Sequence, residues 1–202
     1  MSDSNAPEAK PYHHGDLRRA LVDAARRLLE TEGPAAMSLR AVAREAGVSP
    51  AAPYHHFKDK SELMGAIASE GWALLGEAMV EAHASHPDDS LAVITSYVSF
   101  ARSRPALYRV MFEAARESEK SPFADFREKT NPYVSLRKSL VEREWTSEAD
   151  LEVWILASWA SAHGLAEMLG FRHFEEVKQQ LGGEEPFVRA VLERMAHRNK
   201  PR

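Results

Sequence analysis

The chain has 202 residues, 44% of them hydrophobic and 28% charged, with a formal net charge of −4, a composition typical of a globular domain in water. No apolar run approaches about 18 residues, so we expect no membrane span, and the N-terminus lacks the apolar core of a secretory signal. Cysteine is absent, which excludes disulfides, cysteine nucleophiles and thiolate zinc sites and favours a reducing compartment, the cytoplasm.

The charge is distributed unevenly but weakly. Residues 1–60 hold nine Lys/Arg against eight Asp/Glu, a net charge of +1, whereas the remainder holds 17 against 22, a net charge of −5. The N-terminal part is therefore not a basic patch, and charge alone does not indicate a nucleic-acid partner.

The first predicted element is a helix over residues 16–33. Asp16 is its candidate N-cap, and Gly33, followed by Pro34, is its candidate end. The apolar residues at helical spacing are Leu17, Leu21, Ala24 and Leu28.

A second, shorter helix is predicted to follow. Ser38 is a candidate N-cap, and Gly47 is suited to the left-handed conformation that ends many helices. The predicted inner face consists of Leu39, Val42, Ala43 and Ala46.

Two prolines mark the next element. With Ser49 as N-cap, Pro50 stands at the first helical position, where its missing N–H has no helical partner, and Pro53 stands at the fourth. A helix that ends at Gly47 and another that begins at Pro50 must cross steeply, which predicts a helix-turn-helix. Phe57 is the expected apolar anchor of the second helix.

The side chains of this second helix suit a duplex. Ala51 and Ala52 are small enough to meet thymine methyl groups in a major groove. Tyr54 and Lys60 are suited to phosphate oxygens. The stretch "KDKSEL" opens a long helix, whose N-terminal amides could accept a further phosphate.

In its order and spacing, "HGDLRRALVDAARRLLETEGPAAMSLRAVAREAGVSPAAPYHHFKDKSELMGAIA" resembles the DNA-binding domain of the tetracycline-repressor (TetR) family. The resemblance implies an all-α fold: a three-helix DNA-binding domain at 13–73, with the helix-turn-helix at about 38–57, and a larger effector-binding and dimerisation domain at 74–202. It also implies a homodimer. Carried onto this sequence, the DNA-facing residues would be Ser38, Arg40, Ser49, Ala51, Ala52, Tyr54, His55, His56 and Lys60.

One departure concerns base readout. The recognition helix lacks the Arg, Lys, Asn or Gln that read base edges with two hydrogen bonds. Readout would then depend on Arg40, on apolar contacts or on DNA shape.

The remaining chain predicts further helices. Pro105 and Pro122 each begin one, and Pro132 kinks or splits the second. An apolar helix ends at Gly170, and an amphipathic helix ends the chain. "SWASAHGL" in the apolar helix resembles a TetR-type C-terminal domain named for its Trp-His-Gly residues, which implies dimerisation through the last long helices. The small residues suited to close helix approach are Ala157, Ser158, Ala160, Ser161 and Ala162.

Candidate effector contacts are aromatic and methionine residues of the body, although residues of this kind at helical spacing are more often plain core. For Trp159 and His163 a structural role, packing at a dimer seam, is favoured over an effector contact. The full set is Tyr108, Met111, Phe112, Phe123, Phe126, Tyr133, Trp159 and His163.

The sequence therefore predicts a bacterial transcriptional regulator, a repressor that a small apolar effector releases from a near-palindromic operator. No cofactor and no metal are expected, because the histidines lack the companions of a zinc site. An enzyme is the rival class, but no G-x-S-x-G, phosphate-binding glycine loop or HExxH occurs. A helical protein-interaction adaptor is the second alternative.

Overall fold

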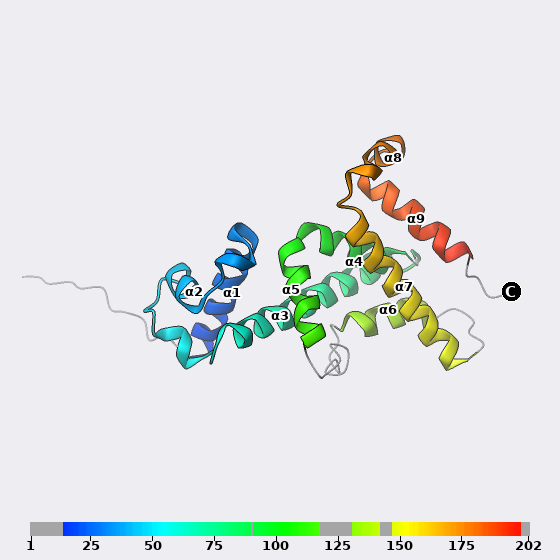
Figure 1. Ribbon diagram of the computed structural model, residues 1–202. Helices are drawn as coiled ribbons and strands as arrows, with labels where there is room; N and C mark the ends of the chain where they lie inside the picture. Colours follow the sequence, from blue (N-terminus) through cyan, green and yellow to red (C-terminus); the bar gives the residue numbers. More distant parts are fainter. Residues whose placement is uncertain (1–13, 90, 118–130, 142–146, 199–202) are drawn as a thin grey trace, which may run out of the picture. The chain divides into compact units, whose positions relative to one another are not determined.

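A computed structural model describes residues 14–89, 91–117, 131–141 and 147–198, whose regular secondary structure is helical, with no strand among them (Figure 1). The chain divides into two compact units, Met1–Ile67 and Ala68–Arg202, here called the head and the body. This division and the predicted one at 73/74 both fall within the long helix α3. The α-helices are α1 (His14–Glu32), α2 (Leu39–Glu45), α3 (Lys60–Ser85), α4 (Ala92–Ser103), α5 (Pro105–Glu117), α6 (Pro132–Val141), α7 (Glu148–Met168), α8 (Glu175–Gln180) and α9 (Glu184–Arg198); short 3-10 turns are η1 (Pro34–Ala36), η2 (Ala52–His55) and η3 (Arg172–Phe174).

The first helix of the head begins earlier than the sequence predicted. It starts at His14, so Asp16 lies inside the first turn and is not the N-cap. Its end is as predicted: Gly33 has a φ of 78° and donates its N–H to the Leu29 carbonyl at 3.0 Å. The buried face of α1 carries Leu21, Ala24, Ala25, Leu28 and Leu29.

Both ends of α2 confirm the sequence prediction. The Ser38 hydroxyl accepts a hydrogen bond from the Ala41 N–H at 3.1 Å. At the other end Gly47 has a φ of 68°, and the N–H groups of Gly47 and Val48 reach back to the carbonyls of Arg44 and Ala43. This paired pattern is a Schellman motif, which needs a residue that tolerates positive φ.

The recognition element differs from the predicted α-helix. It does not begin at Pro50, and Ser49 does not cap it: residues 50–51 form a turn that leads into the four-residue 3-10 element η2. Pro53 has no N–H to donate to the Ser49 carbonyl, which accepts from the Ala52 N–H at 3.0 Å instead. Proline also disfavours the α conformation of the residue before it. The two prolines therefore produce a tight turn, η2, that packs against α2.

The body is organised around α4, which packs against α5, α6, α7 and α9. Helix α3 approaches α5 closely at Gly71, where an added Cβ would lie 2.6 Å from the Met111 sulfur. Pro105 begins α5 and Pro132 begins α6, so Pro132 starts a helix. The helix predicted from Pro122 lies outside the described residues.

A buried lysine holds the α8–α9 hairpin against the end of α7. Lys178 is 5% exposed, and its ammonium donates to the Leu169 carbonyl at 2.8 Å. It also pairs with Glu175 at 2.8 Å and with Glu184 at 3.2 Å. Glu184 bonds Arg102 of α4 as well, so this one cluster fixes α9 beside α7 and α4.

Candidate nucleic-acid interface

The recognition segment, residues 50–56, has a buried side and an exposed side. Pro53 and Phe57 are buried in the head, and the Arg18 guanidinium lies 5.0 Å from the centre of the Phe57 ring. Tyr54 is 53% exposed, which is unusual for so large an aromatic residue and leaves its ring and hydroxyl in solvent. Of the predicted DNA-facing residues, Ala52 and His56 are half-buried and the others are exposed: Ser38, Arg40, Ser49, Ala51, Tyr54, His55 and Lys60.

Two of these residues also have structural tasks that the sequence only partly indicated. The Ser38 hydroxyl caps α2. The Lys60 ammonium donates to the Pro34 carbonyl at 3.2 Å, which fixes the position of its charge and leaves two of its three protons for other acceptors.

Two carboxylates of the chain bond N–H groups at the N-terminus of α3. The Asp59 side chain accepts from the Glu62 N–H at 2.9 Å, and the Glu62 side chain accepts from the Lys58 N–H at 2.7 Å. This reciprocal arrangement resembles a capping box. These bonds occupy the N–H groups of Glu62 and Lys58 and place two negative charges there, which disfavours a bound phosphate. Phosphate binding at this helix end stays a prediction.

The buried centre of the body is a cluster of aromatic rings from four helices. Trp159 of α7 stacks on Trp72 of α3, with ring centres 6.3 Å apart, and meets Tyr97 of α4 edge-on at 5.0 Å. Phe112 and Tyr108 of α5 pack on the His163 ring. Trp159 and His163 are thus packing residues within the subunit, whereas the structural role favoured from sequence was packing at a dimer seam.

The polar atoms of this cluster bond to one another. The hydroxyls of Tyr97 and Tyr108 are 2.8 Å apart, and both lie within hydrogen-bond reach of His163 Nδ1. Burial raises the pKa of both tyrosines. Burial also lowers the pKa of His163, although Glu167 acts in the opposite direction and Arg116 adds to the lowering. The neutral ring, with Nδ1 as acceptor, is therefore the form that fits.

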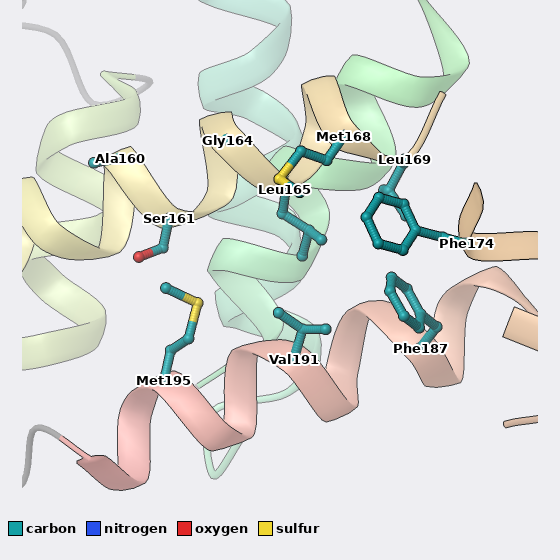
Figure 2. A pocket seen from close by; sticks show the side chains of 10 residues that line it. All are labelled: Ala160, Ser161, Gly164, Leu165, Met168, Leu169, Phe174, Phe187, Val191 and Met195. Carbon is teal, nitrogen blue, oxygen red and sulfur yellow. The ribbon is translucent and has the colours of Figure 1, made fainter. Parts of the chain in front are cut away.

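Two grooves open on the surface of the body. One, of about 350 Å³, is lined by α6 and α7 and includes Tyr133 and Trp159 from the predicted effector set. The other, of about 500 Å³, lies between α7, η3 and α9 (Figure 2). Met111 is fully buried against α3, and Phe123 and Phe126 lie outside the described residues.

The second groove is lined by residues outside the predicted effector set. Phe174, Phe187, Val191 and Met195 line it beside residues of α7, and none of them belongs to the predicted set. The amphipathic pattern of the last helix was the available signal, but pattern alone does not tell which helix faces another.

Similarity to known proteins covers both units. The family description "Bacterial regulatory proteins, tetR family" matches residues 21–67, and "Tetracyclin repressor-like, C-terminal domain" matches residues 90–195. The chain belongs to the TetR family. The description that matches the C-terminal part does not specify the Trp-His-Gly type, so that subtype stays a prediction.

Individual relatives agree with this assignment. The HTH-type transcriptional regulator AcrR of Shigella flexneri is 38% identical over 79 residues, 39% of this chain and 37% of that protein. The regulator BetI of Rhizobium meliloti is 36% identical over 97 residues, 48% of this chain and 42% of that protein. The matches thus span about two fifths of the length of these curated relatives. A solved structure from Rhodococcus sp. RHA1, described as a protein with unknown function, is 28% identical with a TM-score of 0.71, covering 93% of this chain and 97% of that chain.

Two sequence predictions are confirmed at the level of the family. The described residues form an all-α fold, and both curated relatives are described as HTH-type transcriptional regulators. Within the described part of this TetR-family chain, no helix is long and apolar enough to cross a membrane. The same residues contain no group of three or more His, Asp or Glu placed to hold a metal ion.

Acidification should destabilise the body of this TetR-family protein through His163. Its folded-state pKa lies below the unfolded value, so the unfolded chain binds more protons, and the stabilisation present above about pH 6.5 is lost as the pH falls. Thermal unfolding of wild type and His163→Gln between pH 7.5 and 5 measures this. The variant should show a shallower pH dependence; equal slopes would assign the effect to other groups.

Proposed function

We propose that this TetR-family protein is a cytoplasmic transcriptional repressor that binds DNA as a homodimer and is released by a small apolar effector. The observation that carries the proposal is the exposed recognition element, with Ala51, Tyr54 and His55 in solvent while Pro53 and Phe57 anchor it. A segment rigidly attached to a small core and polar at its tip suits entry into a major groove.

In this proposal each subunit inserts residues 50–56 into one major groove. The two grooves would lie about 34–36 Å apart on one face of the duplex, so the operator would be nearly palindromic. The recognition segment supplies methyl groups, a phenol and imidazoles but no guanidinium or amide side chain. Base readout therefore rests on Arg40 of α2, on apolar contacts and on the deformability of the duplex.

The salt dependence of duplex binding tests DNA binding. A duplex of about 30 base pairs, selected from a random pool by the protein itself, would be titrated with protein at several salt concentrations. For a DNA-binding protein, log Kd should rise linearly with the logarithm of the salt concentration, because phosphate contacts release counterions. A helical adaptor would enrich no duplex and show no such slope, which would overturn the proposal.

Substitutions at two exposed positions should weaken this binding without changing the preferred sequence. Lys60→Ala should reduce the salt slope by about 1, because one phosphate contact is lost, and Tyr54→Phe should weaken binding to all duplexes alike through the lost hydroxyl. Lys138→Ala, an exposed lysine of α6, is the matched control and should bind like wild type. Unchanged affinity of either head variant would remove that residue from the phosphate contacts.

The effector site that we propose is the groove between α6 and α7. Its wall includes Trp159, which stacks on Trp72 of α3, the helix whose first residues follow the recognition segment. An occupant that displaces the Trp159 ring would thus act on α3. A ligand can shift DNA affinity only by its differential affinity for two arrangements, typically about 1–3 kcal/mol of coupling.

A neutral apolar dye offers a direct test of this groove. Nile red should bind wild-type protein with a change in tryptophan emission, and Tyr133→Ala should weaken its binding, because Tyr133 lines the groove. Phe171→Ala removes an aromatic ring that is 59% exposed and serves as control. Equal dye affinity in both variants would place the effector elsewhere.

The dimer that we propose forms through the last long helices, α7 and α9. Val153 and Leu156 of α7 are 65% and 69% exposed and also line the α6–α7 groove, and Met195 of α9 is 38% exposed. Large apolar side chains clustered in solvent commonly mark a protein interface.

A further inference from the structure

An arginine outside the predicted DNA-facing set lies beside the recognition segment. Arg18, in the second turn of α1, is exposed, and its guanidinium carbon lies 5.0 Å from the centre of the Phe57 ring. Phe57 follows the recognition segment directly in the chain and is buried in the head. Arg18 therefore lies between the ring that anchors the recognition segment and the solvent.

Arg18 differs from two later arginines of α1, because no carboxylate pairs with it. Arg26 binds Asp23 at 3.1 Å, and Arg27 binds Glu45 at 3.2 Å. In the described part of the chain, no side-chain hydrogen bond or ion pair involves the Arg18 guanidinium. A guanidinium that stacks on a ring keeps the N–H donors at its rim, because they lie in its plane. The Arg18 donors are therefore available to an acceptor that approaches from solvent.

A second cation of the head stands at the opposite end of α1. The Lys60 ammonium donates to the Pro34 carbonyl at 3.2 Å, just beyond the last residue of that helix. From Arg18 to Glu32 the helix advances about 20 Å along its axis. The major groove of DNA is about 12 Å wide. Two cations at this spacing can therefore contact phosphates on the two borders of one groove.

A phosphate is the acceptor that fits the Arg18 guanidinium in this place. Arginine donates two parallel N–H bonds to an oxyanion such as phosphate, and the ring beneath it fixes the guanidinium before a partner arrives, so less side-chain freedom is lost on binding. The recognition segment has no guanidinium of its own. Phosphate contacts from outside that segment would then fix its register on the duplex.

We propose that Arg18, held by the Phe57 ring, donates to a backbone phosphate of the operator on the border of the major groove opposite to the phosphate that Lys60 contacts. The contact carries no base information, because every nucleotide has the same phosphate, and it orients the recognition segment in the groove. This inference rests on the proposed DNA binding and adds α1 to the elements that touch the duplex.

Replacement of Arg18 by methionine tests the contact. Methionine keeps an unbranched apolar side chain over the Phe57 ring but carries no charge, so Arg18→Met should unfold at the wild-type temperature. Its Kd for the selected duplex should rise about tenfold at about 0.1 M salt, and its salt slope should fall by about 1, because one phosphate is no longer neutralised. Arg19→Met makes the same change at the next exposed position of α1, on another face of the helix, and should bind like wild type.

A double variant tests whether the two cations contact different phosphates. Arg18→Met combined with Lys60→Ala should lower the salt slope by about 2, because two separate contacts are lost. A fall of only about 1, the same as for either single variant, would show that both side chains act on one phosphate and would overturn the arrangement on two borders.

Neutral phosphates provide a readout that a packing defect would not change. Each phosphate of the selected duplex is replaced in turn by an uncharged methylphosphonate. Wild type and Arg19→Met should lose affinity at one phosphate where Arg18→Met loses nothing further. If Arg18→Met stays sensitive at every phosphate that affects wild type, its weaker binding comes from a disturbed Phe57 anchor, and the proposal is wrong.

The outcomes separate this inference from the proposed function. An Arg18→Met variant that binds the duplex with the wild-type Kd and salt slope would reject the Arg18 contact and leave the repressor standing. A wild-type protein that enriches no duplex would reject both.

Discussion

Phe57→Ala should abolish duplex binding although Phe57 is only 1% exposed and does not belong to the DNA-facing set. The ring joins the recognition segment to the head, and removing a buried Phe typically costs about 3–5 kcal/mol. A head of some 55 described residues has little stability to spare, since small domains bury proportionally less surface. The substitution would thus detach the recognition segment from the head, although it removes no side chain that is predicted to contact DNA.

Duplex titration together with thermal unfolding followed by circular dichroism measures this effect. The variant should lose duplex affinity and show an early unfolding transition of the head, with the body's transition unchanged. Phe171→Ala makes the same chemical change at an exposed position of the body and should alter neither quantity. If Phe57→Ala retained wild-type affinity, Phe57 would not be the anchor that we describe.

Trp159→Ala should lower the stability of the body by about 3–5 kcal/mol. Trp159 is 9% exposed and contacts rings of both α3 and α4, so the substitution leaves a cavity and removes two aromatic contacts. For a chain of this length each kcal/mol lowers the melting temperature by about 2–4 °C. Dimer stability should fall as well, because α7 supplies the proposed interface.

Calorimetry at several protein concentrations separates these two effects. Loss of core packing lowers the melting temperature at every concentration, whereas a pure interface defect makes it more dependent on concentration. Trp154→Ala, at a half-buried position of the same helix, is the control and should cost less. A Trp159→Ala subunit as stable as wild type, but monomeric, would place Trp159 in the interface and not in the core.

The helix ends show which structural features can be predicted from residues that are close together in the sequence. Ser38 and Gly47 were predicted as caps and act as caps, because capping depends on side chains and backbone angles within a few residues. The same reasoning failed at Ser49 and Pro50. Two prolines at these positions are compatible with the start of an α-helix and with a 3-10 turn. The structure has the 3-10 turn, in which η2 packs against α2 and Phe57 is buried.

The candidate sites likewise contain features that were predicted from sequence and features that were not. Exposure of Tyr54 and His55 follows from a short element whose apolar residues, Pro53 and Phe57, point inward. Asp59 or Ser61 was expected near the start of α3, but the bonds from the Glu62 and Lys58 N–H groups to the Asp59 and Glu62 side chains were not predicted, since residue identity does not reveal which amides a carboxylate bonds.

By itself the sequence determined an all-helical fold, the caps of α2, the resemblance to the TetR family and most of the residues that face solvent in the head, because each of these depends on neighbours along the chain. Only the tertiary structure decided that Trp159 and His163 close an aromatic cluster, and that α7 and α9 enclose an apolar groove. These features join α3, α4, α5, α7 and α9, which are far apart in sequence. A helical pattern states which side of each helix is apolar, but the pairing of those sides is set by how all of the helices pack at once.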